Sequence, residues 1–270
     1  MSLRQFILNL GTLPIKVGLL AGWFAILMTW ERLLPASRKP ETMTLSPSTR
    51  IGGNITLGLI NAGLWAAVTL PLTAIAIGQA TEKGFFDWRG TWATGFVGLA
   101  IDIVLLDFVA YFWHRASHEV DLLWRFHEVH HRDEFLDATT GVRFHFGEVT
   151  FGSAFRAIFI CGSSTPLEHV IIFDVVMMVM NWLGHSNLRL PAWFEKTLSL
   201  LVVMPSYHWV HHKATQPESE QNYGVLFTIW DRMFGTRALR DRRLGMLLGV
   251  RHQSDLPLGH LLIMPFKERE

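Results

Sequence analysis

The chain has 270 residues, of which half are hydrophobic and only 17% are charged. A soluble domain usually carries about 25% charged residues, so this composition favours a membrane protein with a few spans and one polar lobe. The net charge of +1 gives no reason to expect a nucleic-acid partner, and the single cysteine, Cys161, excludes an intrachain disulfide and a thiolate-rich metal site.

Long apolar runs predict the membrane-spanning elements. Three of them hold roughly 22 residues each, which is the length that crosses the hydrocarbon core of a bilayer. A bundle of buried helices in a soluble protein is the alternative, and it is disfavoured by three runs of this length. The three runs cover residues 13–34, 55–78 and 92–113.

A fourth apolar region is interrupted by a turn that contains Gly162 and Pro166. Its first piece, 149–161, is too short to span alone, so residues 149–184 predict a hairpin-like or re-entrant element. No linker, repeat or low-complexity tract divides the chain, which we therefore expect to form a single domain over residues 1–270. The predicted fold class is an all-α integral membrane protein with about four transmembrane or re-entrant helical elements.

Basic residues predict how these elements are oriented. Arg38, Lys39 and Arg50 follow the first run, and several arginines follow the third, whereas the loop after the second run carries little net positive charge. Loops rich in lysine and arginine face the cytoplasm. We therefore expect a multi-pass protein with a cytosolic, histidine-rich helical cap and an active site on the cytoplasmic side.

Three clusters hold eight of the 13 histidines and lie beyond the third apolar run. Neutral imidazole is the commonest side-chain metal ligand, and spacings of three and four place such rings on one face of a helix. The clusters therefore predict a polynuclear metal site. They are His114-x-x-x-His118, His127-x-x-His130-His131 and His208-x-x-His211-His212.

Two polar residues lie in the third apolar run on the face that leads to the first cluster. Asp107 and Tyr111 precede His114 and His118 at steps of four and three, which places all four on one helix face. A carboxylate in an apolar run is costly unless it is paired, and orienting a ligand through its second ring nitrogen would pair it. A helix-packing contact with some other group is the alternative for Asp107.

Two further histidines stand near the clusters. His185 ends the last apolar run on the same helix face as Asn181, where it is either a ligand or an interfacial residue. His145 lies in the segment 143–148, and the sequence leaves open whether it binds metal. We expect no metal at the histidines that lack companions, which are His169, His252 and His260.

Ligand chemistry narrows the kind of metal site. Imidazole without thiolate suits iron, copper or zinc. Eight or more imidazoles exceed what one four-coordinate zinc ion uses, and a structural zinc site needs only four ligands. The surplus favours a dinuclear catalytic centre.

At these residues the chain resembles the fatty acid hydroxylase/sterol desaturase superfamily, whose members are integral-membrane, histidine-rich di-iron proteins. The resemblance covers about residues 95–240 and rests on the order of the three clusters. The sequence segments around the clusters support the resemblance. They are Tyr111–His118, Leu123–His131, Arg143–Glu148 and Trp230–Thr236.

The resemblance implies an activity and a ligand set. Two iron ions would activate O₂ and hydroxylate or desaturate a lipid, such as a sterol or a fatty acyl chain, with electrons from a separate electron-transfer protein. Asp107, Tyr111, Glu148 and Asn181 would orient the ligands. Some members carry a histidine where this chain has Arg189, so the number of metal ligands is open by one or two. The implied ligands are His114, His118, His127, His130, His131, His185, His208, His211 and His212, with His145 as a tenth or as a neighbouring group.

Two other classes of protein fit the clusters less well. A membrane zinc-dependent hydrolase or amidase acting on a lipid would use zinc-bound water and a carboxylate base, for which Glu128 and Glu148 qualify. A metal transporter would need histidines along a span, whereas these clusters follow the spans. The oxygenase is therefore the preferred reading, and the hydrolase is the alternative.

Overall fold

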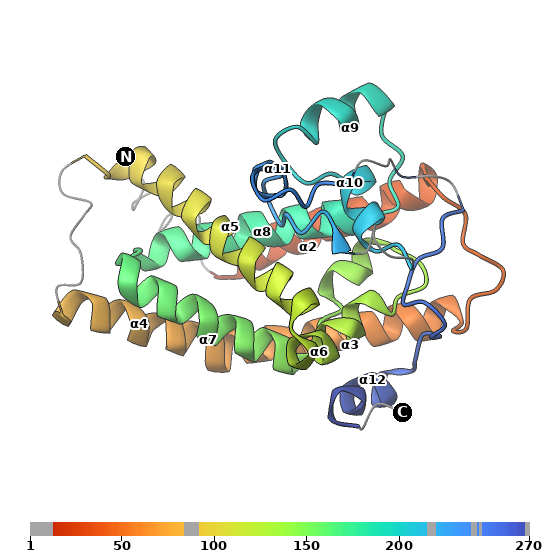
Figure 1. Ribbon diagram of the computed structural model, residues 1–270, viewed down its shortest axis with the longest axis horizontal. Coiled ribbons are helices and arrows are strands. Elements are labelled where there is room, and N and C mark those ends of the chain that lie inside the picture. The colour runs from red at the N-terminus through yellow and green to blue at the C-terminus, as the bar shows by residue number, and fades with distance from the viewer. Residues whose placement is uncertain (1–12, 84–91, 215–219, 239–241, 243–244, 268–270) are drawn as a thin grey trace.

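A computed structural model of the chain is a bundle of α-helices (Figure 1). The structure describes residues 13–83, 92–214, 220–238, 242 and 245–267. In these segments the only β-structure is a few isolated bridges, so the predicted all-α class is confirmed. The longer elements are α2 (Leu13–Leu33), α3 (Pro47–Leu64), the π-helical turn η1 (Trp65–Thr69), α4 (Leu70–Lys83), α5 (Gly95–Glu119), α6 (Asp121–His131), α7 (Phe146–Ser163) and α8 (Leu167–His185). The shorter ones are η2 (Ala138–Val142), α9 (Ala192–Leu198), α10 (Pro205–His211), α11 (Ile229–Met233), α12 (Leu258–Ile263) and η4 (Met264–Phe266).

Three helical stretches in the described segments are long and apolar enough to cross a membrane, namely 47–80, 95–119 and 167–185. The first two contain most of the second and third predicted runs. In the fourth region the turn at 164–166 separates α7 from α8, and α8 is itself a candidate span. The first predicted run forms α2 but is not among the three candidates, so a count of about four spans stays a prediction.

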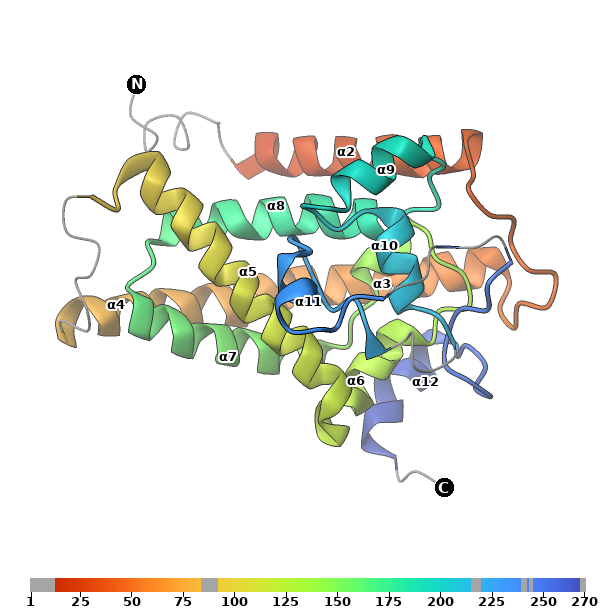
Figure 2. The same cartoon turned by 45° about the horizontal axis from the view of Figure 1, so that its top comes forward.

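The long helices α2, α3, α4, α7 and α8 run roughly side by side and α5 crosses them obliquely, whereas α6, α10 and α12 gather towards one end of the bundle (Figure 2). Leu106 of α5, Ile160 of α7 and Phe173 of α8 form part of the buried core between these helices. The outward surfaces are apolar as well. Phe96 and Ile158 are about three-quarters exposed, at 76% and 75%, as expected for side chains that meet lipid.

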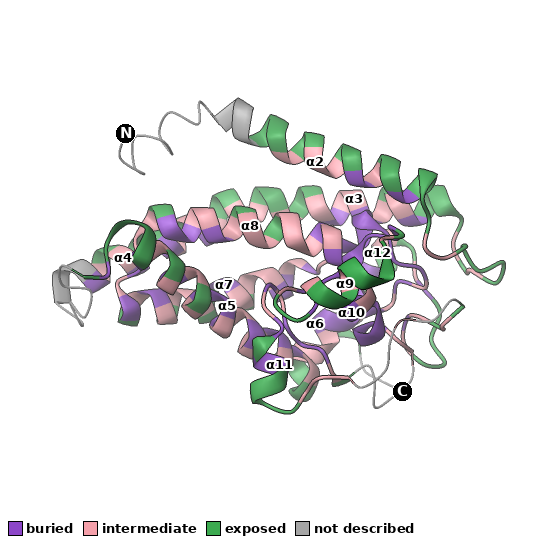
Figure 3. Cartoon of the chain, turned by 90° about the horizontal axis from the view of Figure 1, so that it is seen from above, coloured by how far each residue is buried: buried purple, intermediate pink, exposed green. Residues whose placement is uncertain are grey.

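The chain turns at Val120, the residue between α5 and α6. Its backbone is extended, and α6 begins at the next residue, so the chain turns without a loop. The histidine clusters on α5 and α6 consequently face each other. Figure 3 shows buried residues concentrated where α6 and α10 meet the long helices, whereas α9 and the outer face of α2 are exposed.

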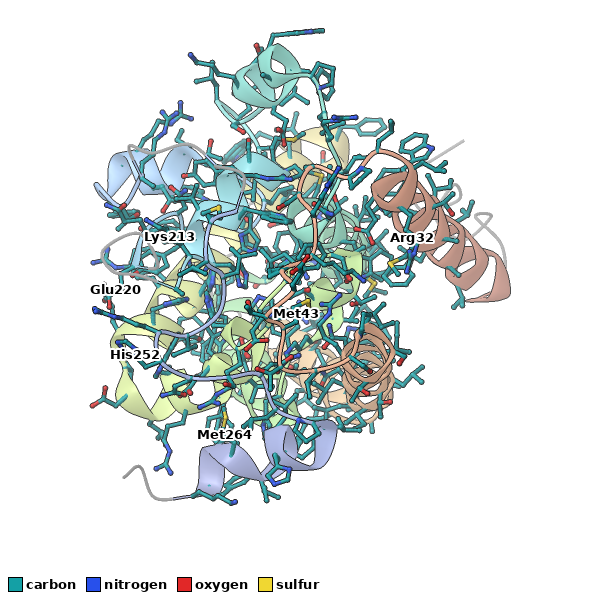
Figure 4. The ribbon with its side chains drawn as sticks, turned by 90° about the vertical axis from the view of Figure 1, so that its right-hand side faces the viewer. Arg32, Met43, Lys213, Glu220, His252 and Met264 are labelled. Carbon is teal, nitrogen blue, oxygen red and sulfur yellow. The ribbon has the colours of Figure 1, made fainter. Side chains whose placement is uncertain are left out.

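A buried ion network fixes the start of α3 against the segment 133–143. Arg50 donates to Asp133 at 2.8 Å and also to Asp137, whose carboxylate caps η2. Arg143 pairs with Asp255 from the C-terminal segment and donates to Asn54 at 3.1 Å. Buried charges need such partners, and here they join residues far apart in sequence. Figure 4 views this end of the molecule, with Met43, Lys213 and His252 labelled.

Candidate metal centre

Nine histidines come together in two groups at the end of the bundle where the short helices gather. In each group every ring offers one nitrogen, and these nitrogens lie within 4.8 Å of one another. We name the groups after the helix that contributes to only one of them. The α5 group contains His114, His118, His127, His131 and His211, and the α8 group contains His130, His185, His208 and His212.

The two triplets on α6 and α10 supply both groups because of helical geometry. Residues four apart share a face, whereas adjacent residues point about 100° apart. His127 and His131 of α6 therefore join the α5 group, and His130 joins the α8 group. On α10, His208 and His212 are the pair four residues apart, and they join the α8 group, whereas His211 joins the α5 group. The rings of His131 and His212 stack at 4.3 Å where the two groups meet.

In the α5 group the protons are held away from the centre. The Nδ1–H of His127 donates to Glu148 Oε1 at 2.7 Å, and those of His114 and His211 donate to the main-chain oxygens of Tyr223 and Gln221, each at 2.8 Å. A neutral ring that donates through Nδ1 keeps an unprotonated Nε2 for a metal. The Nε2 atoms that are buried without a hydrogen-bond partner belong to His118, His127, His131 and His211.

In the α8 group the Nε2 atoms face one another directly. His130 and His185 donate through Nδ1 to the main-chain oxygens of Arg143 and Asn181, at 3.2 and 2.7 Å. The Nε2 of His185 lies 3.0 Å from that of His130 and 2.9 Å from that of His208, and the Nε2 of His212 lies 3.1 Å from that of His208. Several imidazole lone pairs at this separation are the arrangement expected around a cation.

Burial favours the neutral ring at five of these histidines. It lowers the pKa of His130, His131, His208 and His212 well below the usual value of 6.5, and that of His211 to about 3, with neighbouring imidazoles adding to the effect. Metal binding requires the unprotonated ring, so no proton has to be displaced at neutral pH. Two groups of imidazoles without thiolate fit two ions of iron, copper or zinc.

Glu148 is the one predicted orienting residue whose side chain meets a ligand ring. The carboxylate of Asp107 accepts instead from the Leu226 and Phe227 amides and the Trp230 indole, at 2.7–3.0 Å. Asp107 therefore joins α5 to the segment 226–230, which is the helix-packing alternative, because this segment offers it three hydrogen-bond donors.

Tyr111 and Asn181 also direct their side chains elsewhere. The Tyr111 hydroxyl lies 2.8 Å from Thr236 Oγ1. The Asn181 side chain donates to Gly141 O at 2.6 Å, and it is the main-chain oxygen of Asn181 that orients His185. The backbone of Asn181, not its amide group, therefore contacts one of the clustered histidines.

The structure does not bring His145 into either group. Its Nδ1 accepts from the Gly147 amide at 2.9 Å as the N-cap of α7, and its Nε2–H donates to Leu262 O at 3.1 Å. Both ring nitrogens are therefore engaged within the chain. We leave His145 out of the ligand set, because a ring in this state has no free lone pair to offer.

Asp231 supports the α5 group and was not singled out from the sequence. Its carboxylate accepts from the amides of Tyr223 and Gly224 and from the Tyr207 hydroxyl, each at 2.8 Å. These bonds fix the loop whose main-chain oxygens at 221 and 223 orient two ligands. In the sequence, the only indication that Asp231 belongs to the site is its position in the segment Trp230–Thr236. No spacing rule connects that segment to His114 or His211. Glu128, the other candidate base, pairs with Arg132 at 2.8 Å.

Comparisons with known proteins identify relatives of this chain. The chain is 28% identical over 218 residues to the ornithine lipid hydroxylase OlsE of Rhizobium tropici, covering 78% of this chain and 63% of that protein. It is 29% identical over 177 residues to the alkylglycerol monooxygenase of Danio rerio, covering 64% of this chain and 35% of the relative. It is 30% identical over 158 residues to the very-long-chain aldehyde decarbonylase GL1-5 of Oryza sativa subsp. indica, covering 54% and 24%.

The chain thus spans less than two thirds of the length of each of these relatives. No solved structure matches it significantly. The model of the fatty acid hydroxylase family matches residues 99–236, which is slightly more than half of the chain and includes all nine histidines of the two groups. The chain therefore belongs to the fatty acid hydroxylase family.

Proposed function

We propose that this protein is a membrane-bound di-iron oxygenase that hydroxylates or desaturates a lipid. One observation carries the proposal: nine imidazoles form two adjacent groups, and several of them hold their proton on Nδ1 and turn Nε2 towards the group. Family membership and relatives named as lipid hydroxylases and monooxygenases support a lipid substrate. The α5 group and the α8 group would each hold one iron ion.

Iron at both groups would supply the activation of O₂, which side chains alone do not perform. The residues of the chain have the task of holding and orienting the ligands. Glu148 fixes the tautomer of His127, and the main-chain oxygens of Gln221 and Tyr223 do the same for His211 and His114. Such partners raise the basicity of a ligand and restrict its rotation.

The apolar helices would hold the lipid and keep bulk water from the centre. The groups lie where α5 and α8, both candidate spans, meet the short helices. Positive charge near the clusters favours a cytoplasmic location for this end of the bundle. Electrons would come from a separate donor protein, as the resemblance to the di-iron superfamily implies.

Elemental analysis of the protein, purified in mild detergent without added metal, tests the metal assignment. We expect about two iron ions per chain, with the loss of the α5-group ion in His211→Ala and of the α8-group ion in His212→Ala. Membranes that contain the wild-type protein should then incorporate ¹⁸O from labelled O₂ into a lipid, or form an alkene from it in an O₂-dependent way. Zinc as the bound metal, together with lipid cleavage that proceeds without O₂, would replace this proposal with the hydrolase.

A further inference from the structure

An exposed apolar surface follows α8 and stands apart from the histidine groups. α9 projects from the body of the molecule (Figure 1) and has no buried residue. Trp193 is 72% exposed, Leu201 67% and Met233 62%, which is unusual for such large apolar side chains in water. We call this surface the α9 rim. It consists of Trp193, Leu200, Leu201, Ile229 and Met233.

Hydrogen bonds hold the two parts of the α9 rim together. The amide of Thr228 donates to Leu201 O at 3.1 Å, and its hydroxyl donates to Ser199 O at 3.1 Å. The guanidinium of Arg232 donates to Leu200 O. The segment after α9 and the start of α11 therefore form one continuous surface, so the exposure of the rim is a property of the fold.

The α9 rim begins where apolar helices end. α8, a candidate span, ends at His185. The segment that follows pairs with the end of α2 through Arg189 N–H to Leu34 O and Ala36 N–H to Asn187 O, both at 2.8 Å. α9 starts three residues after Arg189, and Figure 4 shows it standing out sideways from the bundle rather than extending it.

The surface around the rim fits a lipid bilayer. α8, the candidate span that precedes the rim, also has exposed apolar side chains, since Val175 and Met178 are more than a third exposed. Basic side chains at Arg189, Lys196 and Arg232 are exposed beside it and can reach anionic headgroups. Tryptophan is also the residue that favours the boundary between headgroups and acyl chains.

We propose that the α9 rim is embedded in the bilayer, at the acyl–headgroup boundary of the leaflet that borders the metal centre. The proposal does not depend on the identity of the metal or on the reaction. A rim in this position would bring lipid close to the α8 group. Val203 follows Leu201 by two residues and packs beside Gly184, because a Cβ built on that glycine would lie 3.7 Å from the Val203 side chain. Gly184 directly precedes His185 of the α8 group.

The sole cysteine makes the test direct. In a Cys161→Ser background, Leu201→Cys carries an environment-sensitive fluorophore in full-length protein reconstituted into nanodiscs. Leu59→Cys on α3 serves as the lipid-facing control, since Leu59 is 68% exposed within a candidate span. Glu41→Cys in the exposed 34–46 loop serves as the aqueous control. Trp193→Cys provides a second rim position if Leu201→Cys does not fold.

Nitroxide-labelled acyl chains and aqueous iodide then report the surroundings of each label. We expect the label at position 201 to be quenched strongly by the nitroxide lipid and weakly by iodide, as at position 59. The label at position 41 should behave in the opposite way. Strong quenching by iodide at 201 would place the rim in water and overturn the proposal. Protection from both quenchers would mean that protein covers the rim, either a second copy or another partner, and would overturn it as well.

Discussion

The α5 group and the α8 group share two helices but are held in different ways. The α5 group depends on a carboxylate, Glu148, and on a loop that Asp231 fixes. In the α8 group, His130 and His185 bond to main-chain oxygens, and the Nε2 atoms already lie about 3 Å apart. The comparison teaches that side-chain substitutions outside the ligands can disturb the α5 group selectively, whereas the α8 group is sensitive mainly to its own histidines.

Removal of a ligand should have the largest effect. We expect His118→Ala to lose the metal of the α5 group and to reduce activity below detection, because His118 contributes to that group alone. The α8 group should keep its metal, as elemental analysis would show. His260→Ala, on exposed α12, is the matched control and should keep both ions and full activity. Loss of both ions in His118→Ala would mean that the two groups bind metal as one unit.

Glu148 tests the orienting carboxylate without removing a ligand. Glu148→Ala should weaken metal binding or activity by about 10–100-fold, because His127 loses the acceptor of its Nδ1–H. Glu148→Gln retains an oxygen acceptor and should recover part of this loss. Metal titration that resolves the two ions would measure the effect. Equal weakening of both groups would contradict the difference drawn between them.

Acid should act on both groups alike. Burial lowers the pKa of His130, His131, His208, His211 and His212, so these rings stay neutral in the folded metal-free protein while the unfolded chain takes up protons. Stability should therefore fall as the pH drops below about 6.5, by up to about 1.4 kcal/mol per histidine for each pH unit. Thermal unfolding of metal-free protein between pH 7.5 and 5.5 would measure this, and a flat profile would contradict it.

Asp231 should show a smaller effect that combines stability and metal binding. Asp231→Ala leaves the Tyr223 and Gly224 amides without their acceptor, which should cost about 2–3 kcal/mol of folding free energy. The α5 group should also bind its metal more weakly, because the loop at 221–224 loses its anchor. Thermal unfolding and metal titration together would distinguish this dual effect from a loss of stability alone.

The smallest effect is expected at His145. His145→Ala removes the N-cap of α7 and should cost about 1 kcal/mol of stability. Metal content should stay unchanged, since both ring nitrogens bond within the chain. A loss of one metal ion in this variant would return His145 to the ligand set.

Local spacing explains what the sequence could predict. The triplets on α6 and α10 obey the helical period, so their spacing predicts a site with several imidazoles, whereas the division of the rings between two groups is known only from the structure. The length of α7 did not follow from hydropathy, because the helix starts at Phe146 under the His145 cap and includes the polar Glu148 before the apolar run. The main-chain oxygens of Gln221 and Tyr223 could not be predicted either, since any residue offers the same acceptor and only the tertiary fold brings it to a ligand.

The main-chain acceptors have a consequence for how such a site changes over evolutionary time. The oxygen that sets the tautomer of His211 belongs to the backbone of Gln221, so a substitution at 221 alters the side chain and leaves that oxygen in place. Drift at this position should be neutral for the metal, whereas drift at Asp231 should be purged because the loop depends on its carboxylate. Residues close to a metal in space can thus be free to diverge, while a more distant aspartate is held fixed.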